Sequence, residues 1–149
     1  MKTIVSKTTI LVLASTLLAC GETSSTEDGS IAAAPSTPEP EPSFLDLTGD
    51  AAAGEIVFGQ CRTCHQLQAD ANGIGPTLFG VIGREAGAIE GFAYSPANAE
   101  STVVFTPEVM FDYIASPREY IPGTRMAFPG LRDAQDRADL IAFLETQSQ

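Results

Sequence analysis

The stretch FGQCRTCHQL, residues Phe58–Leu67, holds two of the three cysteines in this 149-residue chain and its one histidine. His65 follows directly after Cys64, and Cys61 lies three positions before Cys64. Three kinds of site use such a pattern: a redox-active dithiol, a zinc or copper site, and an attachment site for haem. The rest of the sequence has to decide between them.

The dithiol and the zinc site lack the sequence context or the ligands that they need. A thioredoxin-type dithiol sits in a strand–helix–strand unit, and no alternating strand pattern of any length is present. A zinc site needs four ligands, and residues 49–149 contain no His or Cys beyond Cys61, Cys64 and His65. Haem attachment needs only what is present, because two thiols can add to the porphyrin vinyl groups and the adjacent His can ligate the iron. The motif predicts one covalent haem c, and a copper- or zinc-handling protein is the alternative.

A methionine is the expected ligand on the second face of the iron. Met110 lies among apolar residues at helical spacing, which is typical of a core residue. Met126 lies in YIPGTRMAFPG, a loop stiffened by two Pro-Gly pairs, so we predict that Met126 and His65 are the axial ligands. A His/Met pair raises the reduction potential and leaves no open position on the iron, which favours electron transfer over catalysis. A haem enzyme such as a peroxidase is a weaker third hypothesis, because no second His is available as an acid or base.

Residues 49–149 read as a small all-α domain. Helices are expected near 50–60, where Asp50 is a plausible N-cap, from Thr106 onward, where Pro107 occupies the first helical position, and near 133–146. The long connection between the first two is dense in glycine. So few helices and so much loop indicate that something other than side chains fills the middle of the domain.

The N-terminal third predicts export and a membrane anchor. Residues 1–19 combine two lysines with an apolar run, as in a signal peptide, and the run ends in Leu17-Leu18-Ala19-Cys20, which resembles a bacterial lipobox. An ordinary signal peptide cut near Ala19 is the alternative, but it would leave a stray thiol in an exported protein. We therefore predict a lipid anchor on Cys20, a flexible Pro/Glu/Ser/Thr-rich linker over 20–48, and a location on the periplasmic side of a bacterial membrane.

The charge of the chain excludes one class of partner. Nineteen acidic residues against eight basic ones give a formal net charge of −11. Nucleic acid is therefore not an expected partner, because phosphate binding requires a basic surface.

Taken together, the motifs resemble those of class I c-type cytochromes, the group of mitochondrial cytochrome c and its soluble bacterial relatives. The likeness covers about residues 50–145 and rests on CRTCH, GPTLFGVIGREAG, GFAYSPAN, YIPGTRMAF and DLIAFL, in the order and spacing of the family. The resemblance implies a fold of three to five helices around a covalent haem. It implies a single-electron carrier between respiratory or photosynthetic complexes. A quinol–cytochrome c oxidoreductase or a dehydrogenase would be the donor, and a terminal oxidase or reductase the acceptor.

The resemblance also assigns roles to individual residues. It implies thioether bonds at Cys61 and Cys64, and a Pro76 carbonyl that accepts the second ring N–H of His65. It places five further side chains around the haem, two near the methionine and three near the propionates: Tyr113 and Thr124, and Arg84, Tyr94 and Asn98. It explains Gly54 within a helix as the place where the last helix crosses closely.

Two features depart from the family pattern. Phe105 stands where the family usually has a tryptophan that donates to a propionate. The exposed lysines of the mitochondrial type are absent, and Arg118, Arg125 and Arg132 fall where some of them would lie beside the haem edge. A small positive patch on a negative body is the expectation that follows.

Overall fold

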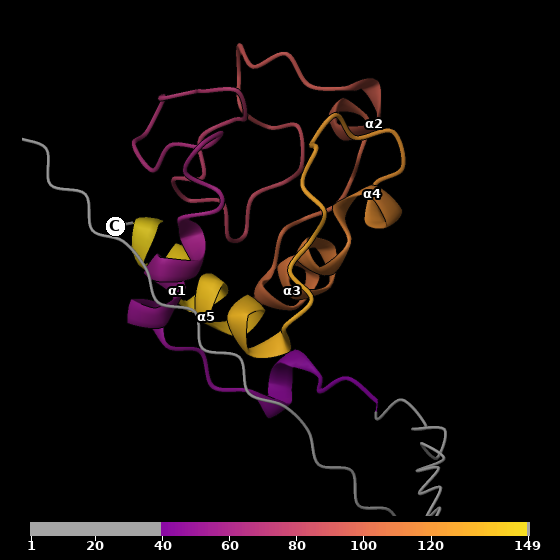
Figure 1. Cartoon of the computed structure of the whole chain (residues 1–149). Helices are drawn as coiled ribbons and strands as arrows, with labels where there is room; N and C mark the ends of the chain where they lie inside the picture. The colour runs from indigo at the N-terminus through magenta and orange to yellow at the C-terminus, as the bar shows by residue number, and fades with distance from the viewer. Residues whose placement is uncertain (1–39, 149) are drawn as a thin grey trace, which may run out of the picture. The chain divides into compact units, whose positions relative to one another are not determined.

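The computed structural model of the chain describes residues 40–148. The expected signal peptide, the anchor residue Cys20 and the linker as far as residue 39 lie outside the described residues. In the part that is described, the elements in chain order are η1 (Phe44–Asp46), α1 (Ala51–Phe58), α2 (Pro96–Ala99), α3 (Pro107–Ala115), α4 (Pro117–Tyr120), α5 (Ala134–Glu145) and η2 (Thr146–Ser148). Figure 1 shows α1, α3 and α5 grouped together and the long loops gathered beyond them.

The all-α prediction is confirmed, and the three expected helices are α1, α3 and α5. Their N-caps are the predicted or adjacent polar residues Asp50, Thr106 and Asp133, whose side chains accept first-turn backbone N–H groups at 2.8–3.3 Å. Between residues 40 and 148 the only strand-like pairing is an isolated bridge between Glu85 and Val104.

The two four-residue helices, α2 and α4, were not expected individually. Each begins at a Ser-Pro pair, Ser95-Pro96 and Ser116-Pro117, with proline at the first helical position. Ser95 also caps α2, because its hydroxyl accepts the backbone N–H of Asn98 at 3.3 Å. A Ser-Pro pair inside a loop is therefore the local signal that would have revealed them.

The crossing of α1 and α5 closes the domain on one side. Gly54 is buried at the crossing, and a Cβ there would overlap the backbone carbonyl of Asp139. The rings of Phe58 and Phe143 meet beside it with centroids 5.4 Å apart. The close approach explains why a glycine occupies a helical position at which it costs about 1 kcal/mol.

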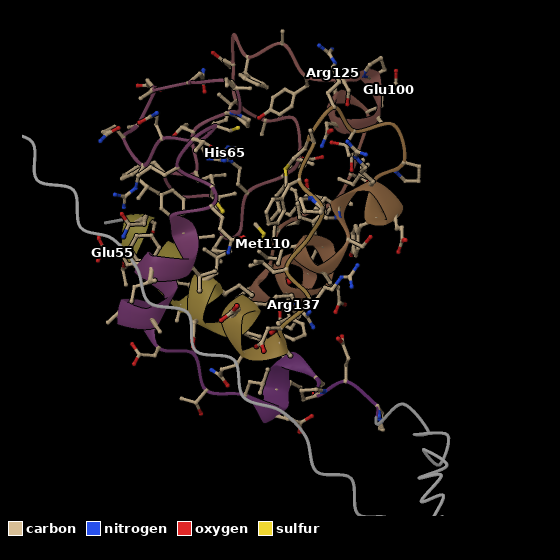
Figure 2. All side chains as sticks on the ribbon, viewed as in Figure 1. Glu55, His65, Glu100, Met110, Arg125 and Arg137 are labelled. Carbon is tan, nitrogen blue, oxygen red and sulfur yellow. The ribbon has the colours of Figure 1, made fainter. Side chains whose placement is uncertain are left out.

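The folded domain that the sequence predicted over residues 49–149 is here called the head. Its packed region begins earlier than the predicted end of the linker at residue 48. Phe44 and Leu47 pack against the core, and the carboxylate of Glu41 contacts the guanidinium of Arg137 at 3.1 Å. Figure 2 shows Arg137 beside the start of α5, close to η1. The physical reason is that two of the three large apolar side chains of residues 41–48, those of Phe44 and Leu47, reach a partly buried position on the helices, whereas Leu45 stays exposed.

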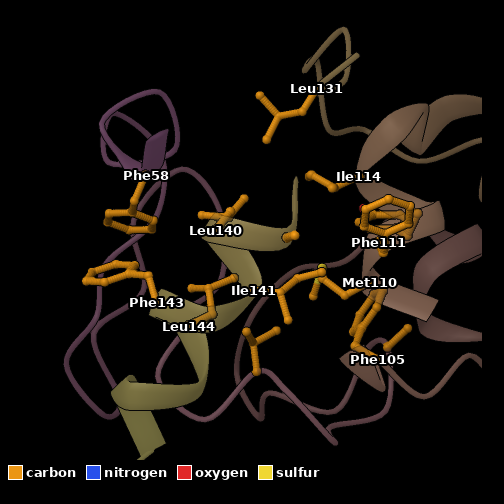
Figure 3. Close-up of a cluster of buried hydrophobic side chains, with 14 of the residues drawn as sticks. Phe58, Phe105, Met110, Phe111, Ile114, Leu131, Leu140, Ile141, Phe143 and Leu144 are labelled. Carbon is orange, nitrogen blue, oxygen red and sulfur yellow. The ribbon is translucent and has the colours of Figure 1, made fainter. Parts of the chain in front are cut away.

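The hydrophobic core joins α3 and α5. Figure 3 shows Met110, Phe111 and Ile114 of α3 facing Leu140 and Ile141 of α5. All five side chains are buried, with Ile141 fully so. These residues hold the two helices together, while the loops on the other side of α3 and α5 leave space for a cavity. Among the helices of the described region, none has both the length and the apolar character to cross a membrane.

Candidate functional site

A cavity of about 590 Å³ lies between the loops and the helices α3 and α5. Its size is in the range of sites that hold small molecules and cofactors. All ten residues of the head that the sequence assigned to the site line it: Cys61, Cys64, His65, Pro76, Arg84, Tyr94, Asn98, Tyr113, Thr124 and Met126. The fold thus brings together residues from at least five separate segments of the chain.

Much of the cavity wall is apolar and was not singled out from the sequence. Leu78 and Val81 come from the loop after the histidine, and Leu140 and Leu144 come from α5. Phe105 also lines the cavity and packs on Tyr113, with ring centroids 5.0 Å apart. The i, i+4 spacing of Leu140 and Leu144 is typical of the inward face of a helix, but such spacing does not distinguish a cavity from packed side chains.

The C-x-x-C-H segment continues from α1 as tight turns. The backbone N–H groups of Cys64 and His65 both donate to the Cys61 carbonyl, at 3.1 and 2.9 Å, which brings the three side chains to one face. The two cysteines are free thiols. Burial raises the pKa of Cys61 to about 11, and the nearby Cys64 adds to the shift. A redox dithiol needs a lowered thiol pKa, so this environment does not suit one.

The histidine ring is held in one orientation. Nδ1 of His65 lies 2.7 Å from the Pro76 carbonyl, which can only accept, so Nδ1 carries the proton and Nε2 keeps a free lone pair. Gly75 lies against the ring so closely that a Cβ there would overlap the imidazole. Burial lowers the pKa of His65, the Pro76 hydrogen bond opposes that shift, and Arg84 adds to it. A neutral, oriented imidazole is the form that binds a metal.

The methionine loop is organised from α3. The hydroxyl of Tyr113 donates to Sδ of Met126 at 3.6 Å, and the backbone N–H of Met126 donates to the Thr124 hydroxyl at 3.3 Å. Burial raises the pKa of Tyr113 to about 12, so the hydroxyl keeps its proton as donor. The thioether of Met126 is therefore both at the cavity and fixed in place.

Met110 also lines the cavity, so its contact with the cavity does not separate it from Met126. The two differ in their surroundings. Met110 is 5 % exposed and belongs to the core cluster on α3, whereas Met126 is half-buried in a loop and takes part in the hydrogen bond from Tyr113. The structure agrees with the sequence in giving Met110 a packing role.

All three residues expected near the propionates line the cavity wall. The guanidinium of Arg84 donates to the carbonyls of Thr77 and Phe79 at 2.7 and 2.8 Å, which fixes it at the cavity. Burial lowers the pKa of Arg84, and Tyr94 opposes that shift. The side-chain oxygen of Asn98 accepts the Ser95 hydroxyl at 2.9 Å.

This donor set fits an iron porphyrin. A flat apolar group of cofactor size needs apolar walls, which the cavity has. The imidazole Nε2 of His65 and the thioether of Met126 are ligands that haem iron takes, and two free thiols stand beside them. Among residues 40–148, no group of three or more His, Cys, Asp or Glu is arranged to hold a metal ion, so the metal-handling alternative is not favoured.

Comparison with known proteins agrees with this geometry. The family model for cytochrome c matches residues 51–148. The chain belongs to the cytochrome c family. It is 49% identical over 100 residues to cytochrome c type-1 of Ascaris suum, which covers 66% of this chain and 89% of that protein. It is 50% identical over 97 residues to cytochrome c2 of Blastochloris viridis, over 64% of this chain and 76% of the relative.

A solved structure shows the same fold. Cytochrome cH from Methylobacterium extorquens aligns with a TM-score of 0.63 and 42% identity, over 66% of this chain and 99% of that one. The predicted class I cytochrome c fold is confirmed. This cytochrome carries one covalent haem c, for which it supplies the C-x-x-C pair, and it is a monohaem electron carrier.

Proposed function

We propose that this cytochrome c is a membrane-tethered carrier that passes single electrons between complexes on the periplasmic side of a bacterial membrane. Cys61 and Cys64 form the thioethers, and His65 and Met126 are the axial ligands. The main observation in support of electron transfer is that the C-x-x-C-H turn and the Met126 loop line the same cavity. The anchor is the lipid-modified Cys20, after removal of the signal peptide 1–19.

The residues of the chain suit electron transfer better than catalysis. When bound, the haem supplies a one-electron couple of its iron. The Pro76 carbonyl holds the lone pair of His65 toward the cavity, and Tyr113 holds the Met126 sulfur. Because His65 and Met126 would both ligate the iron, they would leave no position on it for a substrate. The largely apolar walls offer few polar groups that would have to reorganise when the charge of the haem changes.

The donor is proposed to be a quinol–cytochrome c oxidoreductase or a dehydrogenase, and the acceptor a terminal oxidase or reductase. Exposed arginines beside the cavity support docking there through positive charge. The side chain of Arg118 donates to the Met126 carbonyl at 3.5 Å, and that of Arg125 donates to the Tyr94 carbonyl. Arg132, the third expected member of the patch, is also exposed.

Removing the anchor should shift the protein from the membrane fraction to the soluble fraction without changing its visible spectrum. Produced in a host that attaches haem c, the wild type should sediment with membranes and show a reduced-minus-oxidised c-type spectrum. Cys20→Ser should either release the same spectrum into the soluble fraction, because no acyl chain remains to hold the protein, or block maturation, because the lipid-acceptor Cys is gone. Wild-type protein that is wholly soluble with a free Cys20 thiol would contradict the tether. Membrane-bound protein without haem would instead favour the metal-handling alternative.

Reversing the charge of the patch should slow association with the acceptor. Arg118→Glu and Arg125→Glu, each in the full chain with Cys20→Ser, should lower the second-order rate of electron transfer several-fold at low salt. The difference should vanish at high ionic strength, since salt screens charges beyond about 10 Å at 0.1 M. The measurement is stopped-flow oxidation by the isolated acceptor across ionic strength. Faster transfer in the variants would show that a basic partner docks on the acidic surface.

A further inference from the structure

Residues 41–48, here called the strap, lie on the head although the sequence predicted them as part of the linker. The ring of Phe44 packs on Phe111 of α3, with centroids 5.6 Å apart, and Leu47 packs against the core cluster. Ser43 and Asp46 close the single turn η1 through hydrogen bonds of 2.7 and 3.1 Å. At the far end of the strap, the Thr48 carbonyl accepts the side chain of Gln135 at 2.8 Å.

A charge contact ties the start of the strap to α5. Arg137 is 2 % exposed, and its guanidinium lies 4.3 Å above the Phe111 ring. Its Nη1 donates to two backbone carbonyls, and its Nη2 donates to Glu41 at 3.1 Å. Within residues 40–148 the only carboxylate in an ion pair with Arg137 is that of Glu41, and Nε has no hydrogen-bond partner. The strap thus neutralises a buried cation that the rest of the head leaves unpaired.

The strap occupies helix faces that do not line the cavity. On α3 the lining residues are Met110, Tyr113 and Ile114, whereas the strap contacts Phe111. On α5 the lining residues are Leu140 and Leu144, and Arg137 is not among them. Figure 2 shows Arg137 well separated from Arg125 and Glu100, which lie toward α2. A chain that enters through the strap therefore leaves the cavity uncovered.

We propose that the strap is a docking segment that fixes where the membrane tether joins the head: on the outer face of α3 and the start of α5. This inference rests on the proposed tether. It leaves about 20 residues between Cys20 and Glu41, which can span at most roughly 70 Å. It also biases the orientation of the head. The outer face of α3 would face the membrane, and the side with α2 and the nearby cavity residues would face the redox partners.

Docking of the strap is tested in solution on the reduced holoprotein, as the full mature chain with Cys20→Ser. Backbone order parameters of residues 44–47 should be near the rigid value of about 0.85. Phe44→Ala should lower them below about 0.6 while leaving the visible spectrum unchanged. The matched control is Leu45→Ala, on the same turn but 82% exposed, and it should leave the order parameters as in the parent.

Two results would overturn the docking. One is a strap that is already as mobile in the parent as in Phe44→Ala. The other is a loss of order that is equal for Phe44→Ala and Leu45→Ala. Should Phe44→Ala fail to fold, Glu41→Gln gives the same test, because it removes the carboxylate charge that pairs with Arg137 with little change of shape and should still lower the order at the start of the strap.

The orientation is tested with lipid-reactive photo-cross-linkers in membranes that contain the lipidated full chain. Two exposed glutamates give a matched pair of positions: Glu108, one turn before Phe111 on α3, and Glu100, at the end of α2. The probe at Glu108 should label lipid at least twofold more than the probe at Glu100, and Phe44→Ala should reduce that ratio toward one.

The possible outcomes distinguish a failure of the proposed strap docking from a failure of the proposed membrane tether. Equal labelling at the two positions in a membrane-bound protein overturns the orientation. A protein that does not sediment with membranes, and labels lipid at neither position, overturns the tether and with it the orientation. The order parameters then decide the docking of the strap independently.

Discussion

Replacing Met126 with alanine should lower the midpoint potential by on the order of a hundred millivolts or more, within the roughly 0.8 V range that axial ligands control. A thioether stabilises the reduced iron relative to the oxidised iron, so its loss favours the oxidised form. The variant should also bind small ligands such as cyanide or imidazole much faster, because one position on the iron is open. The weak red absorption band that reports iron–sulfur ligation should disappear.

Met110→Leu is the matched control for this experiment. Met110 lines the same cavity but is packed into the core of α3, and leucine nearly preserves its volume. The control should keep the potential, the red band and the slow ligand binding, with a stability change below about 1.5 kcal/mol. Redox titration and ligand-binding kinetics on the two variants measure both effects. If Met110→Leu loses the band and Met126→Ala keeps it, the ligand assignment is wrong.

Gly54→Val should cost the domain about 3 kcal/mol or more, a large share of the 5–15 kcal/mol that holds a typical domain folded. The new side chain would occupy the space of the Asp139 carbonyl and of the Phe143 Cβ. A backbone carbonyl cannot turn aside as a flexible side chain does, so α1 and α5 have to separate. Their separation would also part the ring pair of Phe58 and Phe143. Denaturant unfolding followed by far-ultraviolet circular dichroism measures the loss.

Gly59→Ala tests whether the effect belongs to the crossing or to glycine in general. Gly59 follows α1 directly, is exposed and has a helical backbone with φ −47°, and the nearest atom to an added Cβ is the Ile56 carbonyl oxygen at 3.0 Å. Its substitution should change the free energy of unfolding by less than about 1 kcal/mol. A Gly54→Val protein as stable as Gly59→Ala would show that α1 and α5 do not cross as closely as in this structure.

The features that the sequence determined are carried by neighbouring residues. The order Cys61, Cys64, His65 is a property of five consecutive positions, and it already indicated haem. The N-caps Asp50 and Thr106 act on backbone groups within their own first turn, so they too could be read locally. Helix existence and the haem prediction followed because the interactions behind them are short in range.

Contacts between distant segments were decided only by the tertiary structure. The Pro-Gly pairs around Met126 favoured it over Met110 as the ligand, but the hydrogen bond from Tyr113 to its sulfur spans thirteen positions and forms only once α3 and the loop have packed. The strap is the clearest case, because Glu41 and Arg137 are separated by 96 positions. The strap follows a polar, proline-rich stretch that is typical of a linker, and its own residues do not identify the Phe111 ring and the buried guanidinium that they contact. Local preference set the helices, whereas burial of Phe44 and pairing of Arg137, both long-range effects, set where the domain begins.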